Sequence, residues 1–256
     1  MSPVTSAGFK VIIPARLAST RLPQKPLLDI SGKPLLQHVY EAARKSAASA
    51  IIIATDSAEI RERAESFGAR VQMTAATHQS GTERLIEVIE KLQEPDDTVI
   101  VNLQGDEFNM PPALVDQVAM ALIDHPRADM ATLCEPITEE NDFNNPNIVK
   151  VIFDQHHIAL DFTRHPVAWF GDAPAPGSGI HGYRHIGIYA YSAGFLRKYA
   201  GLKRCAREIN ERLEQLRVLE YGHRIYVDIA HAQPGLGIDT PEDLEKARRA
   251  IDMMTS

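Results

Sequence analysis

Short runs of β-branched and aliphatic residues alternate with amphipathic segments along the first hundred residues, and this alternation constrains the fold more than any other feature. The strand-like runs lie at residues 10–13, 51–54 and 99–103. The segments with apolar residues at helical spacing lie at residues 34–45, 57–67 and 82–92. Alternating strands and helices predict an α/β fold in which these strands are parallel and ligands bind at their carboxyl ends.

The pattern becomes less regular in the second half of the chain. Further strand-like runs lie at residues 130–133, 148–153, 186–191 and 225–229, and a helix is predicted over residues 206–221. Thr240-Pro241-Glu242-Asp243 has the N-cap residue, first-turn proline and acidic third residue that begin a terminal helix. We therefore predict four regions: a disordered extension at 1–9, an α/β core at 10–140, a smaller lobe at 141–200 with a mobile, Gly- and Pro-rich loop at 171–179, and a return to the core at 201–256.

Composition excludes several classes of protein. Asp and Glu number 34 against 27 Lys and Arg, a net charge of −7, and a surface of this sign repels nucleic acid. The two cysteines, Cys134 and Cys205, have no metal-site spacing and indicate a reducing compartment. The N-terminal residues lack the pattern of a signal peptide, and no apolar run is long enough to span a membrane. We expect a cytoplasmic protein without membrane or nucleic-acid partners.

Three cations gather in the segment that follows the first predicted strand. Arg16, Arg21 and Lys25 lie within ten residues of each other, among prolines and hydroxyl-bearing residues. Because their mutual repulsion is relieved when an anion binds between them, the segment favours a polyphosphate site. The glycine spacing of the known phosphate-binding loops is missing, so side chains and loop amides would hold the phosphates. A solvated basic loop remains the alternative interpretation.

Longer strings then identify a family. The chain contains, in order, IIPARLASTRLPQKPL, GKPLLQHV, IIIATD, HQSGTER, VNLQGDE, LEQLRVLEYG and GIDTPEDLE. Together they cover nearly the whole chain and resemble the 3-deoxy-manno-octulosonate cytidylyltransferases, or CMP-Kdo synthetases. The resemblance implies a homodimeric enzyme that couples CTP to the eight-carbon acid sugar Kdo, releasing CMP-Kdo and pyrophosphate, with Mg²⁺, for lipopolysaccharide biosynthesis. It also implies a Rossmann-like nucleotidyltransferase fold with a mixed central sheet and a smaller lobe for sugar binding and dimerisation.

Two aspartates far apart in the sequence are the candidate metal ligands. Asp106 follows the strand-like run at 99–103, and Asp239 precedes the terminal helix. Each has a structural alternative, because Asp106 could cap a turn and Asp239 could cap the helix. Mg²⁺ binds a few carboxylates together with substrate phosphates, and the matching aspartates of the family bind the metal. The resemblance therefore implies Asp106 and Asp239 as metal ligands, acting with Lys25 and Arg21 in catalysis while Arg16 helps to bind the triphosphate.

The remaining candidates follow from the same resemblance. For the cytidine of CTP they are Ser80, Gly81 and Gln104, although Ser80 could equally be a plain helix N-cap. For the sugar they are Arg164, His185, Tyr189, Glu214 and Gln215, which provide a cation for the carboxylate and polar groups for the hydroxyls. An isolated His or Tyr near a strand could instead be packing.

Several residues depart from the family pattern. Gln24 replaces a glycine, Phe108 replaces the proline of QGDEP, and His165, Pro166 and Ala168 alter the segment beside the predicted sugar site. A related acceptor such as 8-amino-Kdo is therefore an alternative substrate. Two further alternatives are a nucleotidyltransferase for another CMP or NDP sugar and a non-catalytic nucleotide-binding regulator. Retention of Asp106, Asp239 and Lys25 argues against a regulator.

Overall fold

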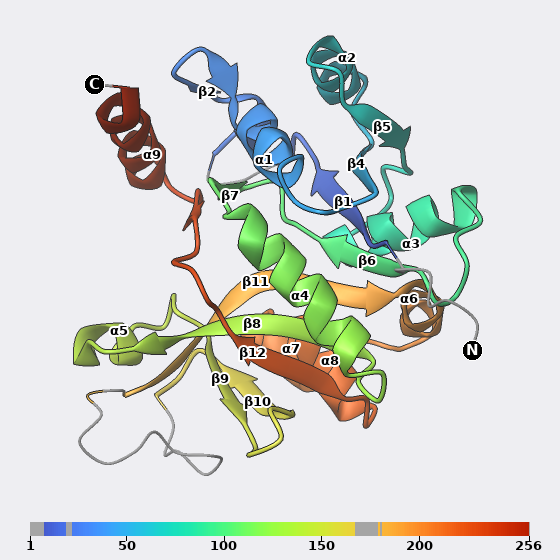
Figure 1. Cartoon of the computed structure of the whole chain (residues 1–256), viewed down its shortest axis with the longest axis vertical. Helices are drawn as coiled ribbons and strands as arrows, with labels where there is room; N and C mark the ends of the chain where they lie inside the picture. Colours follow the sequence, from blue (N-terminus) through green and yellow to red (C-terminus); the bar gives the residue numbers. More distant parts are fainter. Residues whose placement is uncertain (1–7, 19–21, 167–178, 180, 256) are drawn as a thin grey trace.

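The computed structural model describes residues 8–18, 22–166, 179 and 181–255 (Figure 1). Its strands are β1 (Lys10–Ala15), β2 (Asp29–Ile30), β3 (Lys33–Pro34), β4 (Ala50–Thr55), β5 (Arg70–Met73), β6 (Val99–Asn102), β7 (Glu107–Phe108), β8 (Met130–Ile137), β9 (Lys150–Phe153), β10 (Ala159–Thr163), β11 (Gly182–Ser192), β12 (Ile225–Ile229) and β13 (Leu236–Gly237). Its helices are the 3₁₀ helix η1 (Lys25–Leu27) and the α-helices α1 (Leu35–Ala43), α2 (Ala58–Ser66), α3 (Gly81–Lys91), α4 (Pro112–Asp124), α5 (Glu140–Asn144), α6 (Ala193–Ala200), α7 (Ala206–Glu211), α8 (Gln215–Glu220) and α9 (Pro241–Thr255). In the described part of the chain, none of the helices has the length and apolar character that crossing a bilayer requires.

A mixed sheet of nine strands forms the centre of the fold. Its main path runs β10-β9-β11-β6-β1-β4-β5, while β8 pairs with β11 and β12 pairs with β8. The early strands are parallel, since β1 pairs with both β4 and β6 in that sense. The long strand β11 reverses direction and pairs antiparallel with β6, β8 and β9. The predicted α/β class with a mixed central sheet is confirmed.

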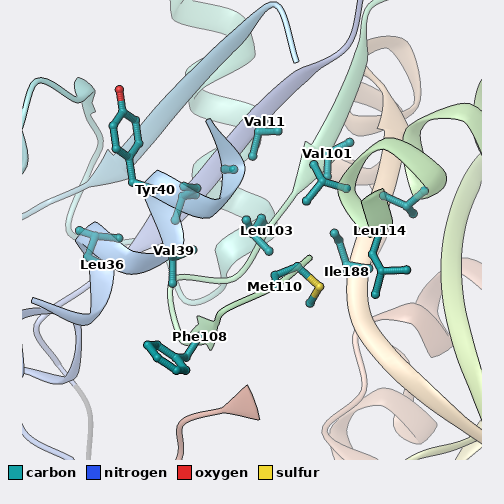
Figure 2. Packing of buried hydrophobic residues seen from close by; sticks show 14 of the residues in the cluster. Val11, Leu36, Val39, Tyr40, Val101, Leu103, Phe108, Met110, Leu114 and Ile188 are labelled. Carbon is teal, nitrogen blue, oxygen red and sulfur yellow. The ribbon is translucent and has the colours of Figure 1, made fainter. Parts of the chain in front are cut away.

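Helices cover both faces of this sheet because its strands are apolar on both sides. Side chains alternate along a strand, so Val11 and Ile13 of β1 join one hydrophobic cluster while Ile12 joins the other. The first cluster contains buried side chains of α1, α2, α4 and α9. Figure 2 shows its centre, where Leu36 and Val39 of α1 and Leu114 of α4 approach β1, β6 and β11. The second cluster contains buried side chains of α3, α6 and α8.

Most of the predicted elements form, and one is wrong. Each strand predicted from an apolar run has a counterpart, as do the helices predicted at 34–45, 57–67 and 82–92. The single helix predicted over 206–221 is two helices, α7 and α8. Arg212 adopts a left-handed conformation with φ 56° that ends α7, and Leu213 then turns into the core, with 6% of its surface exposed. The need to bury Leu213 and Leu216 together explains the break. The elements that were not predicted include the helices α4, α5 and α6 and the strands β2, β3, β5, β7, β10 and β13.

The structure describes each of the four predicted regions in part. In the predicted extension, residues 1–7 lie outside the described residues, while Phe9 is buried in the first cluster. Within 141–200, β11 hydrogen-bonds both to β6 of the predicted core and to β9, so one sheet runs through the boundary at residue 140. The predicted mobile loop at 171–179 lies outside the described residues except for Gly179.

Candidate active site

A cleft of about 660 Å³ lies where β1 and β6 end. Because these two strands are parallel neighbours, their carboxyl ends meet at the same edge of the sheet, as the sequence predicted. Eight of the predicted site residues line this cleft: Arg16, Lys25, Ser80, Gly81, Gln104, Asp106, Glu214 and Asp239. Arg21 lies outside the described residues. Gly105 lines it as well, and a Cβ there would lie 2.9 Å from the Pro14 carbonyl oxygen, so the close approach of these two segments requires glycine.

Lys25 connects the two predicted metal ligands. Its Nζ donates to Asp106 Oδ2 at 2.5 Å and to Asp239 Oδ1 at 3.0 Å. Burial alone would lower the pKa of the Lys25 ammonium, but the charges and hydrogen bonds of the two carboxylates outweigh burial, and this pKa is raised. Lys25 is therefore a cation in the cleft, and the two carboxylates converge on it.

The position of the Lys25 ammonium group shows whether a metal ion could bind between Asp106 and Asp239. One carboxylate oxygen of Asp106 and one of Asp239 contact the same positive charge, that of Lys25. Mg²⁺ prefers such hard oxygen ligands and completes its shell with phosphate oxygens and water. Asp106 and Asp239 thus fit a magnesium site, with the Lys25 ammonium standing where positive charge is needed.

A small ladder between β7 and β13 brings the two aspartates together. Leu236 pairs with Phe108, and Ile238 N donates to the Asp106 carbonyl oxygen at 3.0 Å. The contact at Gly235 is closer still, because a Cβ there would lie 2.2 Å from the Phe108 carbonyl oxygen. A side chain at this position would displace the segment that leads to Asp239.

Capping of α9 leaves the Asp239 side chain available for the cleft. Thr240 Oγ1 accepts from Asp243 N, and Asp243 Oδ2 accepts from Thr240 N, which confirms the predicted start of this helix. Thr240 is thus the capping residue, as the sequence predicted. The Asp239 carboxylate contacts Lys25 instead.

We expect Gly235→Ala to lower turnover by about 10²-fold while the protein stays folded, because an ångström-scale displacement of Asp239 is enough to disturb a reacting geometry. Steady-state kcat and the melting temperature measure the two effects. Gly201→Ala is the matched control, since a Cβ there makes only an ordinary 3.5 Å contact with Lys198 O. Wild-type kcat in folded Gly235→Ala would contradict the positioning role of this ladder.

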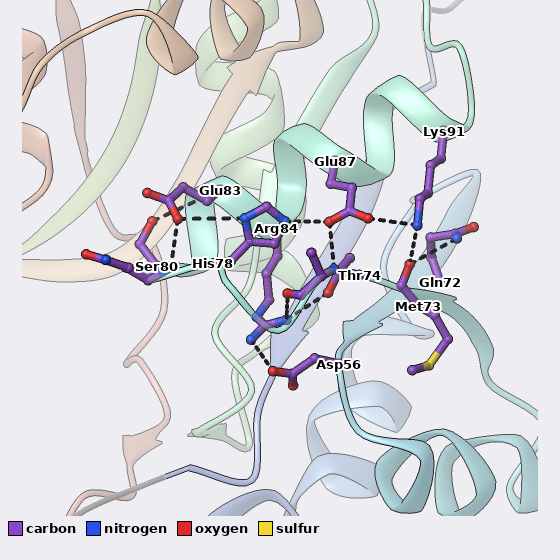
Figure 3. A network of polar contacts seen from close by, with 12 residues as sticks. Asp56, Gln72, Met73, Thr74, His78, Ser80, Glu83, Arg84, Glu87 and Lys91 are labelled. Atoms are coloured by element: carbon purple, nitrogen blue, oxygen red, sulfur yellow. Dashed lines mark hydrogen bonds and ion pairs between the residues drawn. The ribbon is translucent and has the colours of Figure 1, made fainter.

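Polar contacts hold the segment that leads into α3 (Figure 3). Arg84 donates to Asp56 Oδ2 at 2.9 Å and to Thr74 Oγ1 at 2.7 Å. Burial raises the pKa of Glu87, yet hydrogen bonds from Ala75, Lys91 and His78 bring it down to about 2. These contacts fix the course of the chain just before Ser80, so this wall of the cleft is preorganised.

Ser80 itself has a structural role. Its Oγ accepts from Glu83 N, so Ser80 is the N-cap of α3, the alternative that the sequence left open, while it also lines the cleft. His78, Gln79 and Arg84 line the same cleft and were not predicted as site residues. All three belong to the HQSGTER string, and this was the sequence signal that could have identified them as site residues.

A second cavity of about 230 Å³ adjoins the cleft. The two share Gly81, Gln104 and Glu214 as lining residues. Tyr189, Glu214 and Gln215, three of the predicted sugar-binding residues, line the smaller cavity. Thr82 Oγ1 donates to Glu214 Oε2 at 2.8 Å, which orients this carboxylate between the two spaces. Burial raises the pKa of Glu214 despite the hydrogen bonds it accepts.

The other two predicted sugar-binding residues lie elsewhere. His185 is buried, and its Nε2 lies 3.0 Å from Thr132 Oγ1, while its ring packs beside Tyr189. Burial lowers the pKa of His185 to about 3, so the ring is neutral. Arg164 donates from Nε to the Glu211 carbonyl oxygen at 3.0 Å. Neither residue lines the cleft or the second cavity.

Comparison with known proteins decides the family. A family model described as cytidylyltransferase matches residues 10–225. A 3-deoxy-manno-octulosonate cytidylyltransferase from Actinobacillus succinogenes is 50% identical over 254 residues, covering 95% of this chain and 98% of the relative. A 3-deoxy-manno-octulosonate cytidylyltransferase 1 from Actinobacillus pleuropneumoniae serotype 5b is also 50% identical, over 249 residues, 95% of this chain and 99% of the relative. The chain belongs to the 3-deoxy-manno-octulosonate cytidylyltransferase family.

Solved structures agree with this cytidylyltransferase fold. The structure of a CMP:2-keto-3-deoxy-manno-octonic acid synthetase complexed with CTP has a TM-score of 0.87 and 38% identity, covering 96% of this chain and 99% of that one. A cytidylyltransferase from Leptospira borgpetersenii serovar Hardjo-bovis has a TM-score of 0.61 and 17% identity, covering 96% and 87% of the two chains, and shows likeness of fold alone.

The structure shows the local setting of two departures from the cytidylyltransferase motifs. Gln24, in place of glycine, has φ 54°, a left-handed conformation that glycine adopts without strain, immediately before Lys25. Phe108, in place of proline, is buried with its ring edge against His38, and its N–H donates to the Asp106 carbonyl oxygen. A proline could not make that hydrogen bond.

Glu107 is an acidic residue near Asp106 that the sequence did not single out, and it lines neither cavity. Burial, and next the charge of Asp106, raise the pKa of its carboxyl to about 7. Its position in the QGDE string was visible, but its surroundings were not. A third acidic residue therefore lies near Asp106 and Asp239 in this cytidylyltransferase.

Proposed function

We propose that this protein transfers the cytidylyl group of CTP to the anomeric hydroxyl of Kdo, giving CMP-Kdo and pyrophosphate. The convergence of Lys25, Asp106 and Asp239 in one cleft is the observation that carries this proposal. A cleft of about 660 Å³ beside a cavity of about 230 Å³ offers space for a nucleotide and a smaller acceptor. The names of the relatives supply the donor and the acceptor.

The reaction needs positive charge around the α-phosphorus of CTP and the departing pyrophosphate. The sugar hydroxyl attacks the α-phosphorus in line with the departing pyrophosphate, and negative charge develops on both sides of that atom. Lys25 and Arg16 line the cleft and can pair with phosphate oxygens, Arg16 through its bidentate guanidinium. Lys25 would exchange its contacts with the two carboxylates for contacts with the triphosphate. The new phosphorus–oxygen bond replaces the bond to pyrophosphate, and the hydroxyl proton passes to water, so no histidine is required as a general base.

Mg²⁺ is part of the proposal, with Asp106 and Asp239 as the residues that would hold it. The bound ion would polarise the α-phosphate and lower the pKa of the attacking hydroxyl. The side chains orient the substrates around it: the cleft wall at Ser80 and Gly81 and the amide of Gln104 face the nucleotide, while Tyr189, Glu214 and Gln215 line the space for the sugar.

The family also supports a proposal for the location of the protein, its oligomeric state and the use of its product. We infer a cytoplasmic homodimer whose product serves lipopolysaccharide biosynthesis, with Arg21, Arg164 and His185 in the roles that the sequence resemblance gives them. Size-exclusion chromatography with light scattering tests the dimer, and a monomer at micromolar concentration would contradict it.

A coupled assay of pyrophosphate release tests the reaction. Purified protein with CTP and Mg²⁺ should release pyrophosphate with Kdo, and the comparison acceptors are 8-amino-Kdo and a nine-carbon acid sugar. An inactive site variant, discussed below, gives the background rate. Absence of release with Kdo, but release with another acid sugar, would replace the acceptor, and absence with every acceptor would favour a nucleotide-binding regulator.

A further inference from the structure

The smaller cavity contains buried polar atoms that have no partner within the described residues. Tyr199 and Gln215 both line this cavity, with 2% and 3% of their surfaces exposed. Tyr199 Oη and Gln215 Nε2 make no hydrogen bond to any described residue. Burying such a group without a partner destabilises a protein, so the position of these atoms beside a cavity calls for an explanation.

Neighbouring side chains fix the ring of Tyr199, although its hydroxyl has no hydrogen-bond partner among the described residues. Arg217 places its guanidinium carbon 4.6 Å from the centre of the Tyr199 ring, and Phe195 packs edge-on against the same ring. Arg217 is itself fixed, because Nε donates to Glu208 Oε2 at 2.8 Å. The ring therefore cannot turn away to find a partner for its hydroxyl without disrupting this buried cluster.

The second unpartnered atom belongs to a side chain that is held at its other end. Gln215 Oε1 accepts from Tyr189 Oη at 3.4 Å, a long hydrogen bond that leaves Nε2 as the unused donor. Tyr191 and Asn102 line the same cavity, whose wall is thus rich in hydroxyl and amide groups. A polyhydroxylated acid offers both donors and acceptors to such a wall.

We propose that Tyr199 is a further specificity residue for the acceptor sugar, its hydroxyl and the Gln215 amide gaining their partners from sugar oxygens that enter the smaller cavity. This inference rests on the proposed function. It assigns no chemical step to Tyr199, which contributes binding and orientation only.

The test is the variant Tyr199→Phe. Loss of one hydrogen bond to the sugar should raise the KM for Kdo about tenfold, with kcat and the KM for CTP within about twofold of wild type. The melting temperature should stay the same or rise, because the variant removes a buried hydroxyl that has no hydrogen-bond partner within the described part of the chain. A residue that served only the fold would give the reverse pattern, a lower melting temperature with an unchanged KM for Kdo.

Tyr40→Phe is the matched control. Tyr40 Oη donates to the Gly68 carbonyl oxygen at 3.2 Å, and Tyr40 lines neither the cleft nor the smaller cavity. This variant should lose melting temperature and keep both KM values. An unchanged KM for Kdo in Tyr199→Phe, alongside an active wild type, would overturn the inference and leave the proposed function standing. A wild type inactive with every acid sugar would overturn both.

Discussion

Replacing Asp106 with asparagine should leave the protein folded and abolish its turnover of CTP. The amide keeps the size of the side chain but removes the negative charge that Lys25 contacts at 2.5 Å and that the proposed metal ion requires. Losing one such charge in a phosphoryl-transfer site lowers the rate by at least about 10² to 10³, and losing a metal ligand lowers it further. Pyrophosphate release and circular dichroism measure activity and folding.

A remote aspartate provides the control for this variant. Asp116 Oδ1 accepts from Ala47 N at 2.8 Å, away from both cavities, so Asp116→Asn should keep wild-type turnover. Calorimetric titration with Mg²⁺ in the presence of a non-hydrolysable CTP analogue gives a readout besides activity, and Asp106→Asn should weaken that binding. Wild-type turnover in Asp106→Asn would remove the metal assignment.

Lys25→Met should lower kcat/KM for CTP by about 10² to 10³, since the variant removes a positive charge facing the phosphates. The variant should also change how the site binds divalent metal ions when no substrate is present. Lys25 lies between Asp106 and Asp239, and Lys25→Met removes one positive charge from beside the two carboxylates, which makes their oxygens more attractive to a divalent cation. We therefore expect Lys25→Met to bind Mn²⁺ in the absence of nucleotide more tightly than the wild type does.

Electron paramagnetic resonance of Mn²⁺ measures that second effect directly. Lys33→Met is the matched control, because Lys33 pairs with Glu41 on the surface and lines neither cavity. It should leave both kcat/KM and Mn²⁺ binding as in the wild type. Equal Mn²⁺ affinity in Lys25→Met and wild type would mean that the lysine does not stand in for a metal ion between the aspartates.

Local signals in the sequence predicted much of the fold. The run at 10–13 and its counterparts became buried strands because aliphatic side chains on both faces need covering layers. Thr240 and Asp243 began α9 as predicted, since a capping pair satisfies backbone groups within one turn. The break after α7 was not predictable in this way, because the left-handed Arg212 serves the burial of Leu213 against distant elements.

The sequence by itself determined which chemical groups this protein has and where many of its helices and strands lie, because caps, turns and hydrophobic periodicity act between near neighbours. Only the tertiary structure decided which groups meet. Lys25 reaches aspartates 81 and 214 residues away along the chain, His185 packs beside Tyr189, and the Tyr199 hydroxyl is buried without a hydrogen-bond partner among the described residues. Such encounters depend on strand pairing across the sheet and on side-chain direction, which no local pattern specifies.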